Sequence, residues 1–161
     1  MLFRSELQAT ELLFRGVLEP IGPEALAVVF VALIHEERRR GGGVHLPHAV
    51  HGALRRRVAE TLAELAGLEA GLGVAAPLKQ PDFGLTPEVI GWFRWQSIEE
   101  VSESGEHSAG DVCRALRMAI QLMREVRHAI DPKWDLHDRL ADAIARVNRD
   151  EVDARRQLEL G

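Results

Sequence analysis

Residues 108–130 read SAGDVCRALRMAIQLMREVRHAI and form the longest strongly periodic segment of the chain. If successive side chains are placed about 100° apart around a helix axis, with Arg114 at zero, the apolar side chains share an arc from roughly 80° to 240°. A second arc, from roughly 280° to 360°, holds polar and basic side chains and no carboxylate. This set, called the basic face below, consists of Arg114, Arg117, Gln121, Arg124 and His128. The segment is therefore predicted to be a helix with one face in the core and the basic face opposite.

The rest of the chain also favours helices over strands. Apolar residues recur at helical spacing over residues 4–18, 23–40, 47–70 and 136–147. Shorter helices are expected near Thr86, after Ser97 and in the tail 149–161, and Ser97, Ser108 and Asp135 are expected to cap helices. No segment alternates with a period of two over a useful length. We expect a single all-α domain over residues 1–161, an irregular helical bundle of about five main helices plus short ones.

Composition and charge restrict the kinds of protein that the chain can be. It has 161 residues, of which 46% are hydrophobic and 28% charged, as is typical of a globular domain. The net charge is −5, so binding to nucleic acid would have to come from a local basic patch. Cys113 is the only cysteine, which excludes an intrachain disulfide and favours a cytoplasmic location. No apolar run is long enough for a membrane span, so no membrane partner is expected.

Several segments, taken in order along the chain, resemble one known family. They are TELLFRGVL at 10–18, ALAVVFVALIHEE at 25–37, Trp92 followed by Ser97, AGDVCRALR at 109–117 and VNRDEV at 147–152. Together they resemble the DSHCT domain, the C-terminal helical region of superfamily 2 RNA helicases related to the nuclear exosome and superkiller helicases. There are two departures: the family usually has Glu where this chain has Ala109, and two consecutive basic residues where this chain has Arg117-Met118.

The resemblance implies a non-catalytic helicase module that guides single-stranded RNA past the motor. In that family the helix at the position of 108–130 is similar to a ratchet helix that lies across the motor domains. Its strand-facing residues would here be Arg114, Arg117, Gln121 and Arg124, and His128 extends the same face. The implied partners are single-stranded RNA, or DNA, and helicase motor domains in cis or in trans. The chain has no GxxxxGK[ST] loop, so ATP and Mg²⁺ would be held by the parent motor and no cofactor by this chain.

Each candidate site also has a purely structural interpretation. The basic face can be a solvated surface, with cations favoured near the helix C-terminus. Trp92 and Trp95 can stack on bases, but a tryptophan in a short apolar helix more often belongs to the core. The HxxHxxH spacing of His45, His48 and His51 is compatible with a metal site, but a polar surface is the default.

The arginine runs and the cysteine carry weaker signals. Arg38–Arg40 and Arg55–Arg57 are expected to be solvated, because consecutive helical residues point in different directions. Cys113 is expected to be an inert thiol. A protein-docking module without nucleic-acid contact is the alternative function, and an exposed apolar surface around Leu78, Phe83 and Trp92 would favour it.

Overall fold

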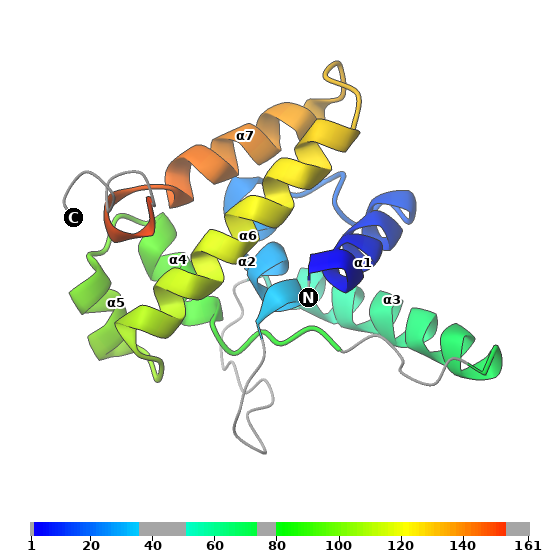
Figure 1. Cartoon of the computed structure of the whole chain (residues 1–161), viewed down its shortest axis with the longest axis horizontal. Coiled ribbons are helices and arrows are strands. Elements are labelled where there is room, and N and C mark those ends of the chain that lie inside the picture. The colour runs from blue at the N-terminus through cyan, green and yellow to red at the C-terminus, as the bar shows by residue number, and fades with distance from the viewer. Residues whose placement is uncertain (1, 36–50, 74–79, 154–161) are drawn as a thin grey trace.

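The computed structural model describes residues 2–35, 51–73 and 80–153, and these residues form helices joined by turns (Figure 1). The helices are α1 (Leu2–Phe14), α2 (Pro23–Ile34), α3 (Gly52–Gly71), α4 (Thr86–Phe93), α5 (Ile98–Ser104), α6 (Ala109–Ala129) and α7 (Asp135–Val147), followed by a short 3₁₀ helix, η1 (Asp150–Val152). No strand occurs in this described part of the chain. The predicted all-α class, an irregular helical bundle of about five main helices plus short ones, is therefore confirmed.

The centre of the bundle is α2. Its sequence, PEALAVVFVALI, carries no charge after Glu24, and every residue from Ala25 to Leu33 is buried. A helix that is apolar on all sides must be surrounded by other elements, and α2 is packed against α1, α4, α6 and α7. Pro23 at its start needs no hydrogen-bond partner for a backbone N–H, which suits the first turn of a helix.

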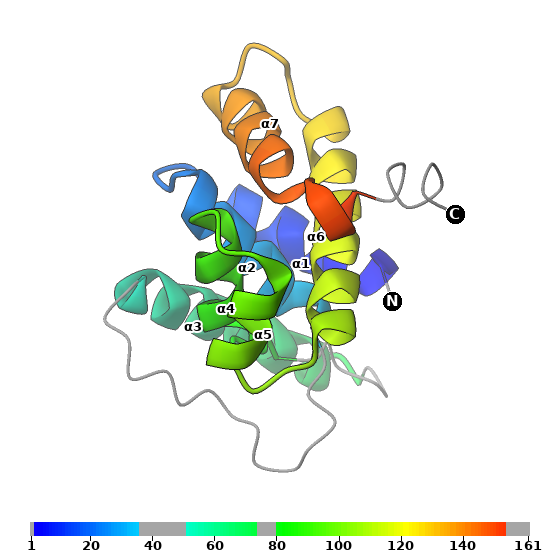
Figure 2. The same ribbon diagram turned by 90° about the vertical axis from the view of Figure 1, so that its left-hand side faces the viewer.

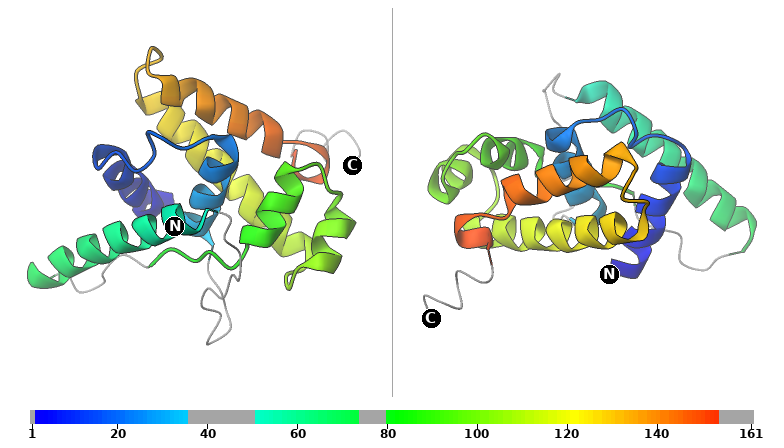
Figure 3. Two further views of the ribbon diagram at one scale, coloured as in Figure 1. Left: turned by 180° about the vertical axis from the view of Figure 1, so that it is seen from behind. Right: turned by 90° about the horizontal axis from the view of Figure 1, so that it is seen from above.

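Helix α6 lies across α2 and alongside α7, as Figures 1, 2 and 3 show from different directions. Its buried side chains are those of the predicted apolar arc: Val112, Ala115, Leu116, Ala119, Ile120, Leu122, Met123 and Val126, together with Cys113. The hydroxyl of Ser108 accepts the backbone N–H of Asp111 at 3.2 Å, so the predicted cap is present. Because one whole face of α6 is held in the core, the backbone that carries the basic face is fixed in place.

Several predicted helix ends are wrong, for identifiable reasons. Helix α1 ends at Phe14, not at residue 18, because Gly16 adopts a φ of +71° and closes the helix. Helix α3 begins at Gly52, because His51 has a φ of +55° and is therefore not in the right-handed helical conformation. Asp135 is the first residue of α7 and Trp134 is its cap, whereas the capping box of Ser97 and Glu100 is present as predicted. No described helix has the length and hydropathy that a membrane crossing requires.

Candidate nucleic-acid interface

Four of the five side chains on the basic face are exposed on the outer side of α6: Arg114, Gln121, Arg124 and His128. With a rise of about 1.5 Å per residue, the positions from 114 to 128 extend over about 21 Å. The apolar face of the same helix is buried throughout this length. The structure therefore presents these side chains in a row on a rigid support.

Arg117 is the exception, because it is half-buried and bonded to the chain itself. Its guanidinium donates from Nε to the carbonyl of Val152 at 3.1 Å, and from Nη2 to the carbonyl of Glu151. Both carbonyls belong to η1, so Arg117 attaches the C-terminal 3₁₀ helix to α6. Periodicity predicts Arg117 on the basic face, but it could not show that the hydrogen-bonding capacity of Arg117 is used within the domain.

Carboxylates border the basic face on one side. Glu125 follows Gln121 by one turn of α6, and Gln121 bonds to its carboxyl group. A hydrogen bond with Glu6 of α1, with a smaller effect of desolvation and of the Glu6 charge, raises the pKa of Glu125. On the helical wheel Glu125 lies at roughly 20°, just outside the predicted arc. The sequence therefore indicated that the carboxylate of Glu125 borders the basic face. The approach of Glu6 to this carboxylate depends on how α1 packs against α6.

The basic face continues into a concave surface between the end of α6 and the start of α7. This concavity has a volume of about 460 Å³ and is lined by Arg124, Arg127, His128, Ile130, Pro132 and His137. Nε of Arg127 donates to the carbonyl of His137 at 3.1 Å, which holds the guanidinium at the concave surface. Arg127 and His137 were not predicted as site residues, because Arg127 lies at the edge of the apolar arc and His137 belongs to another helix.

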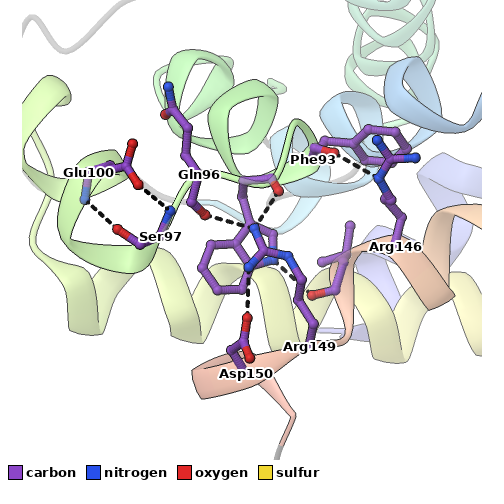
Figure 4. A network of polar contacts seen from close by, with 9 residues as sticks. Phe93, Gln96, Ser97, Glu100, Arg146, Arg149 and Asp150 are labelled. Atoms are coloured by element: carbon purple, nitrogen blue, oxygen red, sulfur yellow. Dashed lines mark hydrogen bonds and ion pairs between the residues drawn. The ribbon is translucent and has the colours of Figure 1, made fainter.

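The two tryptophans proposed for base stacking have different environments. Trp92 is completely buried, and its indole N–H donates to the carbonyl of Val147 at 2.8 Å. The guanidinium of Arg149 lies 3.7 Å from the centre of its ring, and Figure 4 shows this guanidinium among the carbonyls that it contacts. Trp95, in contrast, is 62% exposed. The structural interpretation therefore holds for Trp92, and stacking is possible only for Trp95.

Among the described residues, the other candidates form no second binding site. His45, His48 and the Arg38–Arg40 run lie outside the described part of the chain. Nε2 of His51 is 3.1 Å from Oε1 of Glu24, and no group of three possible metal ligands occurs where the structure describes the chain. Cys113 is buried, and burial raises the pKa of its thiol.

Two expectations about the surface are corrected. Arg55 is buried, and this burial lowers its pKa, whereas its neighbours Arg56 and Arg57 are exposed as predicted. The apolar surface suggested around residues 78–92 is not present as such, because Phe83 and Trp92 are both buried and Leu78 lies outside the described residues.

The family model of the DSHCT (NUC185) domain matches residues 3–154. The chain belongs to this family. DSHCT domains are found in helicases, which supports a helicase C-terminal module as the general class of this chain. No curated protein matches the sequence. Apart from Leu2, the first residue of α1, the match covers every helix that the structure describes in this DSHCT domain.

Proposed function

We propose that this DSHCT domain is the non-catalytic C-terminal module of an ATP-dependent RNA helicase, and that it guides single-stranded RNA past the motor along α6. The observation that carries the proposal is the row of exposed basic and polar side chains on α6, supported by a fully buried opposite face. ATP and Mg²⁺ would be bound by the motor domains, in cis or in trans. This domain would bind and position the strand but perform no chemical step.

The strand contacts are proposed to be mainly phosphate contacts. Arg114 and Arg124 are exposed and lie ten positions apart, or about 15 Å along the helix. Arginine binds phosphate oxygens in a bidentate manner, and such contacts position a strand with little reading of its sequence. The concave surface beside Arg124, with Arg127, His128 and His137, is proposed to receive one phosphate group. Arg117 would act indirectly, by holding η1 against α6.

The test is to change Arg114 and Arg124 together to Ala in the helicase that contains this domain. RNA-stimulated ATPase activity and unwinding should fall, because two phosphates of the strand would no longer be bound by arginine. The slope of log affinity against log salt should decrease by about 0.7 for each phosphate that is no longer neutralised. The matched control is Arg56→Ala with Arg57→Ala, which removes the same charge from exposed positions on α3. Unwinding that is the same in the α6 variant and in the control would show that the basic face does not guide the strand.

One observation favours the alternative function of a protein-docking module. Phe14 at the end of α1 is 81% exposed, Leu68 on α3 is 59% exposed, and Leu72, the residue that follows α3, is 83% exposed. Figure 3 shows that α3 extends away from the rest of the bundle. If Phe14→Ser with Leu72→Ser releases the domain from the motor, while Arg114→Ala with Arg124→Ala leaves unwinding unchanged, docking would be the principal role.

A further inference from the structure

Trp95 stands out because it combines an exposed indole with an unfavourable backbone conformation. Its side chain is 62% exposed, and its φ is +70°. The left-handed region is adopted easily by glycine, but a bulky side chain there is a genuine outlier. Exposing a large aromatic ring to water is a second, independent cost. Such outliers persist only where the surrounding structure holds them in place, and they cluster at functional sites.

The end of another helix in this chain shows which residue type is expected at the position of Trp95. Helix α4 ends with two backbone hydrogen bonds, from Gln96 N–H to the Gly91 carbonyl and from Trp95 N–H to the Trp92 carbonyl. Helix α1 ends in the same way, from Val17 N–H to Leu12 and from Gly16 N–H to Leu13. This pattern places one residue in the left-handed conformation, and that residue is usually glycine. Helix α1 follows the rule with Gly16, whereas α4 has Trp95 at the equivalent place.

Two guanidinium groups lie next to the indole of Trp95. The Cζ atom of Arg146 is 4.8 Å and that of Arg149 is 5.2 Å from the ring centre. Arg146 donates from Nε to the Phe93 carbonyl at 2.9 Å. Arg149 donates from Nη2 to the carbonyls of Trp92 and Gln96, each at 2.7 Å (Figure 4). Backbone carbonyls therefore hold both cations in position before any ligand arrives.

This combination fits a nucleotide better than a protein side chain. An exposed indole offers a π-face on which any unpaired base can stack, and nearby arginines attract the phosphate of that base. The groups beside the exposed ring are cationic rather than aliphatic, unlike the apolar centre of a typical protein interface. Asp150 is 2.9 Å from Arg149 and neutralises part of its charge, so Arg146 would be the main attraction for a phosphate.

We propose that Trp95 is a stacking platform for one unpaired base of a single strand, with Arg146 beside it for the adjoining phosphate and Arg149 holding the turn that carries the indole. The inference rests on the proposed strand-guiding function and adds a second contact to it. The platform is joined to the basic face through η1. Arg117 of α6 holds the carbonyls of Glu151 and Val152, and the preceding residue, Asp150, pairs with Arg149.

The experiment uses the full chain and the substitution Trp95→Gly. Glycine suits the left-handed backbone, so the variant should unfold at the same temperature as the parent or higher, and weaker binding cannot then be attributed to misfolding. The probe is an eight-nucleotide oligouridine strand, titrated to millimolar concentration against each protein by isothermal titration calorimetry, and the tryptophan fluorescence of the parent is recorded in parallel. The parent should be quenched, and Trp95→Gly should bind roughly fivefold more weakly or worse. Trp95→Phe should recover part of the affinity, and Trp134→Phe, the control for the half-buried third tryptophan, should bind like the parent.

A strand of the same length with abasic sites separates stacking from charge. Stacking predicts that removing the bases weakens binding to the parent but has little effect on binding to Trp95→Gly. Equal binding of normal and abasic strands, equal affinity of parent and Trp95→Gly, or no quenching at millimolar strand would each overturn the platform. If Arg114→Ala with Arg124→Ala still impairs unwinding in any of those cases, the proposed function survives and only the platform is wrong. Loss of motor association in Trp95→Gly, with RNA binding unchanged, would identify Trp95 as a protein contact and also overturn the proposal.

Discussion

At the scale of single residues, Gly105 leaves no room for a side chain beside the buried carboxyl group of Glu88. Glu88 is 2% exposed, and its Oε1 atom would lie 2.1 Å from a Cβ atom placed on Gly105. Burial raises the pKa of Glu88, and the nearby His107, whose Nδ1 is 3.4 Å from Oε2, opposes this shift only in part. Gly105 has a φ of −107°, so the backbone does not require glycine there, but the space does.

The substitution Gly105→Ala should therefore destabilise the domain. The new methyl group would collide with a carboxylate that cannot swing into solvent, which typically costs about 1–3 kcal/mol. The measurement is chemical denaturation followed by circular dichroism. Gly110→Ala is the matched control, because nothing lies within 4 Å of a Cβ atom at this exposed position in the first turn of α6. The control should be neutral or stabilising by up to about 1 kcal/mol. Equal stability of the two variants would contradict the packing described here.

At the scale of elements, α6 shows which features a local sequence pattern can predict and which it cannot. The spacing of its apolar residues predicted the buried face correctly, because residues three and four apart share a side of any helix. The same spacing contained no information about which element approaches the outer face. The packing of α1 against α6 brings Glu6 to Glu125, and the hydrogen bond between the two side chains raises the pKa of Glu125.

This contact predicts a pH-dependent effect of Glu6→Gln. Since the pKa of Glu125 is raised in the folded state, the contact stabilises the fold below the unfolded pKa of about 4.3 and ceases to do so as pH rises through the higher folded value. At pH 7 the two charges repel each other. Glu6→Gln should therefore increase stability at pH 7, by less than about 1 kcal/mol because solvent screens the pair, and should give no gain at pH 3.5.

Thermal unfolding of parent and variant across this pH range measures the effect. Glu11→Gln on the same helix is the control of opposite sign, since Glu11 is 2.7 Å from Arg15 and its attraction to that partner weakens when it is neutralised. A stabilisation by Glu6→Gln that is the same at both pH values would show that charge repulsion is not its cause.

At the scale of the whole molecule, arginines of α7 and the segment after it connect the end of the chain to earlier turns. Arg139 donates from Nη1 to the carbonyls of Leu18 and Ile21, which lie between α1 and α2. Arg146 and Arg149 bind carbonyls at the end of α4, as Figure 4 shows. These guanidinium groups satisfy backbone carbonyls where helices end, which is a task that short side chains cannot perform over such distances.

The long-range bonding of Arg139 predicts a specific decrease in stability. Arg139→Ala should destabilise the domain by about 1.5–3 kcal/mol, because charged hydrogen bonds are removed and part-buried carbonyls are left without this partner. Arg139→Lys should restore only part of this, since an ammonium group lacks the planar fork. Arg114→Ala, on the exposed basic face, is the control and should change stability by less than about 0.5 kcal/mol. Denaturation midpoints that coincide for Arg139→Ala and Arg114→Ala would refute the role of Arg139 as a connector.

The sequence by itself determined the all-α class, the buried face of α6, the helix caps at Ser97 and Ser108, and the order of segments that identifies a DSHCT domain. These properties depend on side chains a few positions apart, and helix geometry alone relates such positions. Only the tertiary structure decided that Arg117 is used internally, that Trp92 is buried while Trp95 is exposed, and that Glu6 lies beside Glu125. The hydrogen-bond partners involved are distant in the chain, at least 34 positions away for Arg117 and 55 positions away for Trp92. Such pairs meet only when the helices pack, because no local period relates them.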